Sequence, residues 1–417
     1  MSELIELNKE EERVILVGVC EQEQEEGQVL KSLEELAELA KTAGAVVVGK
    51  IIQNREHPHP ATYVGKGKID EIKDEIWETE ATGIICDDEL SPMQIRNLKE
   101  ALETKVMDRT LLILDIFAGR ASTNEGKIQV ELAQLKYRQS RLTGYGTSLS
   151  RLGGGIGTRG PGEKKLEMDR RLIKNRIAQL NRELKDVKRH REVTREQRKK
   201  TGIPIVAIVG YTNAGKSTLL NKLTSAGVLE ENKLFATLDP TTRNLILPSK
   251  QEILLTDTVG FIRKLPHHLV QAFRSTLEEA KYADIVLHVV DTSSDQMDEQ
   301  MHVVYETLTD LDVVQKPIIT AFNKQDLLEE EEIIRDFKAE YTLKISAKTG
   351  EGLDKLQDAI AKLLRNQKVE IERLYTYDEA GKIQIIRKYG ELIAEDYRDE
   401  GIFVKGYIPK ELYEKTR

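Results

Sequence analysis

Residues 210–217 read Gly210-Tyr211-Thr212-Asn213-Ala214-Gly215-Lys216-Ser217, and this stretch decides the fold of the domain around it. An apolar run, residues 203–209, comes before it, and residues 218–223 follow with apolar side chains at helical spacing. The order is therefore strand, glycine-bearing turn and helix, with the spacing G-x-x-x-x-G-K-S. This pattern predicts a loop that binds the phosphates of a nucleotide.

The residue types in the loop suit a triphosphate. Backbone N–H groups at a helix start can surround the phosphates, and glycine at positions 210 and 215 lets the backbone approach them. Lys216 supplies a positive charge to the β- and γ-phosphates, and the Ser217 hydroxyl is a ligand for Mg²⁺. A lysine in a glycine-rich turn by chance is the alternative, which the motifs below make negligible. The predicted phosphate-binding residues are Gly210, Tyr211, Thr212, Asn213, Ala214, Gly215, Lys216, Ser217 and Thr218.

Length and composition indicate a soluble globular chain. Its 417 residues are enough for roughly three domains, with 39% hydrophobic and 32% charged residues. No run approaches the ~20 apolar residues of a membrane span, and the acidic N-terminus does not resemble a signal peptide. We therefore expect a cytoplasmic protein. Cys20 and Cys86 lie in strand-like apolar runs, so we expect buried free thiols.

Residues 1–125 alternate between strand-like and helical patterns. Expected strands at 13–19, 45–48, 83–86 and 105–107 are separated by helical segments, which predicts a parallel α/β domain. The stretch Tyr63-Val64-Gly65-Lys66-Gly67-Lys68 lies at the start of one helix. It either holds a phosphate of a second nucleotide or of RNA, or forms an ordinary turn and cap.

Residues 126–201 carry two heptad-like apolar stripes, which predict an antiparallel α-hairpin. The break between the stripes holds eight of the 28 glycines of the chain within 19 positions, residues 144–162. A segment so rich in glycine cannot bury a core, and we expect it to form a loop.

The hairpin is strongly basic. Residues 127–200 contain 21 Lys and Arg against 8 Asp and Glu, a net charge of +13, whereas the whole chain carries −8. Such a projection favours phosphate contacts with a polyanion, RNA above all. The alternative is a solvated face of charged helices, for which acidic partners are too few. The candidate RNA-binding residues are Arg151, Arg159, Lys164 and Lys165.

Residues 202–367 hold further motifs in the order that a GTPase requires. In the loop 235–242, Thr237 is favoured over Thr241 and Thr242 as the threonine that reaches Mg²⁺ when the γ-phosphate is present. In the next motif, Asp257 holds the metal through water and the Gly260 N–H binds the γ-phosphate. The predicted metal ligands are thus Ser217 and Thr237. The predicted catalytic residues are Lys216, Thr237 and Gly260. The nucleotide-binding residues of these two motifs are Phe235, Ala236, Thr237, Leu238, Asp239, Asp257, Thr258, Val259 and Gly260.

Two motifs predict guanine specificity. The Asp326 carboxylate can accept from N1–H and the exocyclic amine of guanine, whereas adenine presents an acceptor at N1 and lacks that amine. Lys324 would lie over the base plane and Asn323 would brace the loops. The Ala347 N–H, in Ser346-Ala347-Lys348, can donate to guanine O6.

One departure bears on mechanism. Many GTPases place a water-orienting glutamine directly after the switch glycine, but this chain has Phe261 there. A phenyl ring cannot hydrogen-bond water, which predicts slow intrinsic hydrolysis that a partner accelerates. Asn213 either holds a monovalent cation, K⁺ for instance, as a substitute positive charge or is purely structural.

Residues 368–417 are expected to form a small α+β module. Strands are predicted at 369–374, 383–386 and 401–407, with a turn at 378–381 and a helix or loop before the last strand. No catalytic constellation is present in this stretch.

Over essentially the whole chain the residues resemble HflX-type GTPases. The resemblance rests on GYTNAGKST, FATLDPTTR, DTVGF, NKQD and SAK, with TYVGKG and GGGIGTRGPGEKKLEMDRR before them. It implies a Ras-like GTPase domain that uses Mg²⁺ and a protein that binds the large ribosomal subunit. It also implies separation of stalled or idle ribosomes into subunits, often under stress, and ATP binding by the N-terminal domain in some members.

Two functions from different classes follow. The first is a ribosome-directed GTPase whose GTP-bound form inserts the hairpin into rRNA. The second is a regulatory GTP switch acting on a protein partner, at a membrane surface for example, with the basic hairpin meeting acidic protein or lipid. In either case GTP and GDP are the ligands and a monomer is expected. Steep salt dependence of ribosome binding would separate the two.

Overall fold

The computed structural model describes residues 11–22, 25–142, 161–224, 234–235, 238, 240–266, 279–313, 316–328, 334–366 and 368–417. The chain divides into two compact units. The first runs to Asp186 and also takes in a short segment that starts at Lys264. The second contains Val187–Arg263 and the chain from Phe273 to Arg417.

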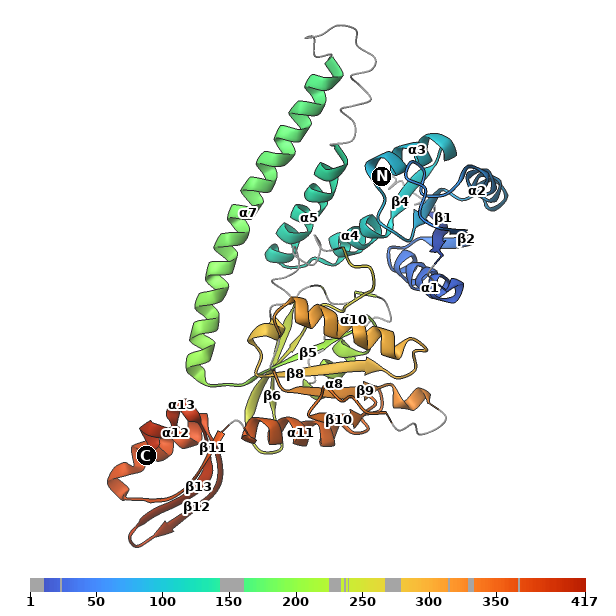
Figure 1. Cartoon of the computed structure of the whole chain (residues 1–417). Helices are drawn as coiled ribbons and strands as arrows, with labels where there is room; N and C mark the ends of the chain where they lie inside the picture. The colour runs from blue at the N-terminus through green and yellow to red at the C-terminus, as the bar shows by residue number, and fades with distance from the viewer. Residues whose placement is uncertain are drawn as a thin grey trace, which may run out of the picture. The chain divides into compact units, whose positions relative to one another are not determined.

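A parallel sheet of four strands, in the order β2-β1-β3-β4, forms the centre of the first unit (Figure 1). The strands are β1 (Arg13–Glu21), β2 (Val46–Arg55), β3 (Gly83–Cys86) and β4 (Lys105–Asp108). Helices α1 (Glu26–Thr42) and α4 (Arg109–Arg120) cover one face, and α2 (Lys66–Thr79) and α3 (Pro92–Leu102) cover the other. This confirms the predicted parallel α/β fold. Helix α4 was not predicted; it begins directly after β4, where Asp108 caps it by accepting from the Leu111 N–H at 2.8 Å.

The predicted helical hairpin is present, and its second helix continues from the first unit into the second. Helices α5 (Asn124–Leu142) and α7 (Pro161–Thr201) lie side by side in Figure 1. Ile128 and Leu132 of α5 pack against Leu180 of α7. The helices are antiparallel because Leu142, at the end of α5, contacts Arg170 early in α7, whereas the earlier residue Glu131 pairs with Arg176.

The first hairpin helix is bonded to the sheet domain. Asp108, at the end of β4, is fully buried and accepts from the Tyr137 hydroxyl at 2.8 Å. The same carboxylate pairs with Arg141 at 2.7 Å, and the Arg141 guanidinium stacks over the Tyr137 ring. These contacts fix the end of α5. The loop predicted at 144–162 lies outside the described residues up to position 160, and residues 161–162 belong to the start of α7.

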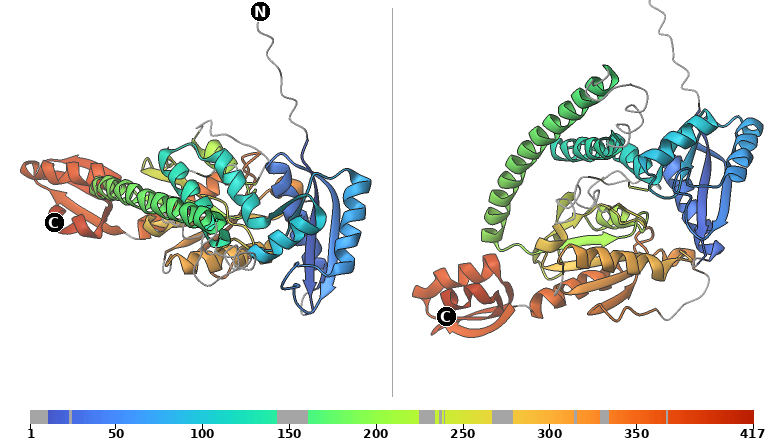
Figure 2. Two further views of the ribbon diagram at one scale, coloured as in Figure 1. Left: turned by 90° about the horizontal axis from the view of Figure 1, so that it is seen from above. Right: turned by 45° about the horizontal axis from the view of Figure 1, so that its top comes forward.

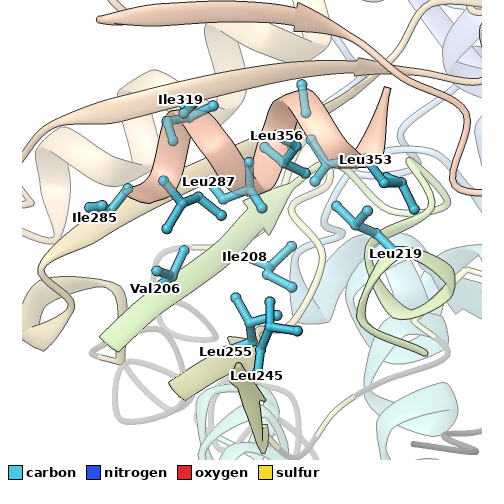
Figure 3. Close-up of a cluster of buried hydrophobic side chains, with 14 of the residues drawn as sticks. Val206, Ile208, Leu219, Leu245, Leu255, Ile285, Leu287, Ile319, Leu353 and Leu356 are labelled. Atoms are coloured by element: carbon cyan, nitrogen blue, oxygen red, sulfur yellow. The ribbon is translucent and has the colours of Figure 1, made fainter. Parts of the chain in front are cut away.

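The sheet of the second unit has six strands in the order β10-β9-β8-β5-β7-β6, and only β6 is antiparallel to its neighbour. Its strands are β5 (Ile205–Gly210), β6 (Thr241–Ile246), β7 (Glu252–Asp257), β8 (Ile285–Asp291), β9 (Ile318–Asn323) and β10 (Tyr341–Lys344). Figure 3 shows α8 (Lys216–Thr224) and α11 (Leu353–Asn366) packing through leucines onto the face that carries Val206 and Ile208. Helix α10 (Met297–Asp310) packs on the opposite face, and the 3₁₀ turn η1 (Gln325–Leu327) follows β9.

The C-terminal residues form the predicted α+β module, with two corrections. An antiparallel sheet in the order β11-β13-β12 is covered on one face by helices α12 and α13 (Figure 2). Residues 383–386, predicted as a strand, lie in helix α12, and the predicted turn at 378–381 spans the end of the 3₁₀ turn η2 and the first residues of α12. The segment before the last strand, predicted as a helix or loop, forms strand β12. The elements are β11 (Lys368–Tyr375), η2 (Tyr377–Glu379), α12 (Ala380–Tyr389), β12 (Glu391–Arg398), β13 (Gly401–Pro409) and α13 (Lys410–Thr416).

The wrong assignment of residues 383–386 to a strand has a physical cause. Thr376 and Glu379 form a capping box at the start of this helical segment, and Ile383 and Ile386, three positions apart, are both buried. A run of four residues is too short to show whether its period is 2 or 3.6.

Both cysteines are buried thiols outside any disulfide, as predicted. Within the described ranges, none of the helices combines the length and the apolar character that crossing a membrane requires.

Candidate nucleotide-binding site

The loop after β5 requires glycine at both of the positions singled out in the sequence. Gly210 has φ +153°, and a Cβ there would lie 2.2 Å from the Val289 carbonyl oxygen. Gly215 has φ +95°, and a Cβ there would lie 2.3 Å from Nδ2 of Asn323. The loop is therefore packed closely against the ends of β8 and β9. Any other residue at either position would push the strand ends away from the loop.

Lys216 begins helix α8, and its side chain is buried, with 7% exposed. Its ammonium donates to the Tyr211 carbonyl oxygen at 2.6 Å, which bends the side chain back over the loop. Burial lowers the pKa of Lys216 to about 8, against the opposing influence of the Asp257 carboxylate. A partly desolvated cation in a phosphate-binding loop is well suited to an anionic ligand, because the ligand replaces the solvation that burial removed.

Ser217 and Asp257 meet at the position predicted for the metal. The Ser217 hydroxyl donates to Oδ2 of Asp257 at 2.8 Å, and the Asp257 side chain is fully buried at the end of β7. Mg²⁺ prefers oxygen ligands, and a hydroxyl beside a buried carboxylate provides such a donor set. These residues therefore fit the Mg²⁺ that P-loop GTPases normally use, with Ser217 as ligand and Asp257 acting through water.

The chain after Asp257 is hydrogen-bonded to the phosphate-binding loop. The Phe261 N–H donates to the Gly210 carbonyl at 3.1 Å, and the Thr212 N–H donates to the Phe261 carbonyl at 2.8 Å. A Cβ on Gly260 would lie 2.9 Å from both Nζ of Lys216 and Cα of Thr212. Gly260 thus lies beside the lysine that would contact the β- and γ-phosphates. Phe261 is 2% exposed, so a phenyl ring occupies the position at which many GTPases carry glutamine.

Asn323 joins three of the predicted motifs. Its Nδ2 donates to the carbonyl of Ala214 in the phosphate-binding loop at 2.8 Å, and its Oδ1 accepts from the Ala347 N–H at 2.8 Å. This agrees with the bracing role expected of it. The Ala347 N–H, however, is the group predicted to donate to guanine O6. In this structure it is engaged by Asn323, so that contact stays a prediction.

The predicted base-reading residues follow β9. Asp326 lies in the 3₁₀ turn η1, and its Oδ1 accepts from the Ser346 hydroxyl at 2.6 Å, which orients the carboxylate. Lys324, with φ +67°, pairs with Asp291 at 2.6 Å. Asp291 was missed in the sequence, although a signal existed: like Asp257 and Asn323, it is the polar residue that ends a buried strand.

Several predicted residues lie elsewhere or outside the described part of the chain. Ala236, Thr237 and Asp239 are outside it, so the role of Thr237 stays a prediction; Phe235 and Leu238 are buried. Asn213 is exposed, with φ +62°. Outside the described ranges are also Arg151 and Arg159, whereas Lys164 and Lys165 lie in the first turns of α7. The remaining predicted nucleotide-binding residues are also described. Thr218 lies on α8, Thr258 and Val259 follow β7 directly, and Lys348 follows Ala347.

The glycine–lysine stretch of the first unit is engaged within the protein. The Gly65 N–H donates to Oε1 of Gln53 at 2.8 Å, and Lys68 pairs with Glu71 at 2.6 Å. Gly65 is the N-cap of α2, and the buried Tyr63 donates to Asp88 at 2.6 Å. A second nucleotide at this turn stays a prediction.

Family models match three consecutive stretches of the chain. They are described as GTP-binding GTPase N-terminal (residues 30–118), GTP-binding GTPase Middle Region (120–198) and 50S ribosome-binding GTPase (205–324). Together they cover more than half of the chain.

Curated relatives match over the full length. A protein named GTPase HflX from Lacrimispora saccharolytica is 68% identical over 99% of this chain and 97% of its own. A protein of the same name from Caldanaerobacter subterraneus is 51% identical over 99% and 94%. A solved structure of a GTP-binding protein from the archaeon Sulfolobus solfataricus, in complex with GDP, covers 84% of this chain and 98% of that one, at 27% identity and a TM-score of 0.45. The identity to the curated relatives over the full chain shows that this protein is a GTP hydrolase of the HflX family.

Proposed function

We propose that this protein binds the large ribosomal subunit and uses its GTP cycle to separate stalled or idle ribosomes into subunits. The observation that carries the proposal is the combination, in one chain, of a guanine-nucleotide site that places Phe261 where glutamine is usual and a basic helical hairpin. The match of residues 205–324 to a model described as a 50S ribosome-binding GTPase supports the choice of partner. Such a protein would act in the cytoplasm.

The site residues have distinct tasks in this proposal. Lys216 and the backbone of the loop hold the phosphates, and Asp326 reads the base. Ser217, with Asp257 through water and Thr237 from the switch loop, would hold Mg²⁺, which neutralises charge on the β- and γ-phosphates. Phe261 offers no hydrogen bond to the attacking water, so the isolated protein hydrolyses GTP slowly. The ribosome accelerates hydrolysis by reshaping the site.

The hairpin supplies the RNA-facing surface. Helix α7 carries a set of exposed basic side chains between the described positions 167 and 193: Arg171, Lys174, Arg182, Lys185, Lys188 and Arg189. The acidic Glu131 of α5 is already paired with Arg176. Exposed arginine and lysine along one helix favour contacts with the phosphates of rRNA.

Co-sedimentation with 50S subunits tests the proposal. With a non-hydrolysable GTP analogue the protein should pellet with the subunits, and the logarithm of the binding constant should fall steeply with the logarithm of salt concentration. Replacing Lys185 and Lys188 by Gln should make that slope shallower by about 1 for each rRNA phosphate that is no longer neutralised. The same replacement at Lys355 and Lys362, exposed on α11, is the matched control and should change the slope less.

Two further measurements decide the outcome. Shortening residues 144–162 should abolish subunit separation and leave GDP affinity unchanged. If the shortened protein still separates ribosomes, the role given to the loop is wrong. If the full protein does not bind ribosomal particles in any nucleotide state, a switch acting on a protein partner or a membrane surface replaces this proposal.

Comparing the rate of GTP turnover in potassium and in sodium tests whether Asn213 holds a monovalent cation.

A further inference from the structure

Asp291 lies next to the guanine-reading motif although it belongs to none of the sequence motifs. It is the last residue of β8, and the β8–β9 register pairs it with Asn323. Its Oδ2 is 2.6 Å from Nζ of Lys324, and the two side chains are 14% and 23% exposed. The ion pair is therefore largely shielded from solvent, and it involves the lysine expected to cover the base.

The Asp291 carboxylate is held in place by its own loop. The Ser293 N–H and hydroxyl both donate to Oδ1, at 3.0 and 2.6 Å, which leaves Oδ2 for Lys324. Asp291 is thus an oriented anion rather than a mobile surface group.

The next residue joins the two strand ends. The Thr292 N–H and hydroxyl donate to the Asn323 carbonyl at 3.1 and 2.5 Å, and Nε2 of Gln325 donates to the Thr292 hydroxyl at 3.1 Å. The segment 291–293 therefore holds the backbone directly before Lys324 and the side chain of the residue directly after it. This matters because Lys324 has a left-handed backbone conformation, which is uncommon for a residue with a Cβ.

We propose that Asp291 is a positioning residue for guanine nucleotides: its ion pair holds the Lys324 side chain ready to lie over the base. A free lysine loses rotamer entropy when it is fixed in one conformation. A lysine already fixed by Asp291 has lost most of that entropy before the nucleotide arrives, so more of its contact with the base contributes to affinity.

The effect should appear in nucleotide affinity and not in the chemical step. Asp291→Asn keeps the shape of the side chain and removes the charge that holds Lys324. We expect the dissociation constants of GDP and GTP to rise together by about tenfold, the range for losing a hydrogen bond to a charged group. The turnover number at saturating GTP should stay unchanged. Asp291→Glu, which keeps the charge on a longer side chain, should recover part of the affinity.

A double-mutant cycle distinguishes positioning from simple stabilisation of the fold. If Asp291 acts through Lys324, Asp291→Asn should cost little further GDP affinity in a Lys324→Ala background. Asp295→Asn removes a charge from an exposed position four residues further along and is the matched control, expected to bind GDP like the parent.

Two results would overturn the proposal: parental GDP affinity in Asp291→Asn, or the same loss of affinity whether or not Lys324 is present. The second result would indicate a structural role alone, which thermal unfolding of the nucleotide-free variants would show directly. Should Asp291→Asn fail to fold, the cycle is run with Asp291→Glu, and a loss of affinity that persists in the Lys324→Ala background would equally contradict the proposal.

Discussion

The Ser217 hydroxyl donates to the Asp257 carboxylate at 2.8 Å, although 40 positions separate the two residues in the chain. They meet because β5 and β7 are parallel neighbours, so the loop after one strand and the last residue of the other lie at the same edge of the sheet. This edge is the usual position of ligand sites in open α/β sheets. The pair places a hydroxyl and a carboxylate oxygen at the position predicted for Mg²⁺.

Ser217→Ala should remove the effect of Mg²⁺ on GTP affinity. In millimolar Mg²⁺ we expect GTP to bind at least about tenfold more weakly than to the parent, because the metal loses a ligand. In the presence of EDTA the two proteins should bind alike. Titration of a fluorescent GTP analogue measures this. Ser217→Thr keeps a hydroxyl and should behave like the parent; if the alanine variant retains full Mg²⁺ dependence, Ser217 is not a ligand.

Asn323→Ala should weaken both the fold of the second unit and nucleotide binding. The change leaves the buried Ala214 carbonyl and the Ala347 N–H without their partner, at a cost of about 1–3 kcal/mol for each group. Thermal unfolding measures the loss of stability, and GDP titration measures the loss of nucleotide affinity.

Two comparisons sharpen the Asn323 prediction. Asn323→Asp should be at least as damaging as alanine, since a carboxylate oxygen would then face the Ala214 carbonyl. Asn244→Ala, on the exposed edge strand β6, is the matched control and should change unfolding by less than about 1 kcal/mol. Equal behaviour of the two alanine variants would contradict the bracing role of Asn323.

Nucleotide affinity should fall as the pH rises above about 8. Burial lowers the pKa of Lys216 to about 8 in the nucleotide-free protein, and bound phosphates would raise it again because they favour the charged ammonium. Above pH 8 binding therefore requires uptake of a proton, and affinity should decrease by up to tenfold per pH unit. GDP titrations at pH 7, 8 and 9 measure the slope. Lys216→Ala should bind weakly at every pH and show no such slope; a slope equal to that of the parent would assign the titration to another group.

Ionised Asp87 should stabilise the first unit, and this stabilisation should be lost at low pH. Asp87 is buried, which raises its pKa, but Arg109 and Lys264 beside it, with hydrogen bonds from Lys264 and Ser32, bring the pKa below its ordinary value. A carboxylate with a depressed folded-state pKa stabilises the protein above the unfolded-state pKa and loses that contribution as pH falls through the folded-state value.

Asp87→Asn should therefore reduce the free energy of unfolding by about 3 kcal/mol at neutral pH. The difference from the parent should shrink as the pH falls below about 4, because Asp87 of the unfolded chain becomes protonated there while the folded-state carboxylate, with its lower pKa, stays charged. Denaturant unfolding of both proteins at pH 7, 5 and 3.5 measures this difference in the free energy of unfolding. Asp74→Asn, exposed on α2, is the control and should change stability by less than about 1 kcal/mol. A difference that stays constant down to pH 3.5 would show that the charge of Asp87 is not its source.

The sequence allowed the class of the site to be predicted because its signals are local. The phosphate-binding loop, the DTVGF motif and the NKQD motif are each contiguous, and each follows an apolar strand. Their order along the chain then implied one sheet edge. The helical hairpin was predictable for the same reason, since its apolar stripes repeat over many turns.

Errors and omissions arose where the deciding contact is distant in sequence or the pattern is short. Four residues at 383–386 do not distinguish a strand from a helix, and α4 gave no clear period. Asp291 could not be linked to Lys324 from the sequence, because that contact depends on the register between β8 and β9. The same holds for the Ala347 N–H, which is engaged by Asn323, 24 positions earlier.

The sequence by itself thus determined that this chain carries a guanine-nucleotide site, a basic hairpin, two parallel-type α/β folds and a small α+β module, because spacing and composition act over short stretches. Only the tertiary structure decided which side chains hold the site residues in place: Asn323 between two loops, Asp291 on Lys324, and the backbone of Phe261 on the phosphate-binding loop. These contacts form when strands far apart in the chain end at one edge of a sheet, and side-chain geometry at that edge is not encoded in any single stretch.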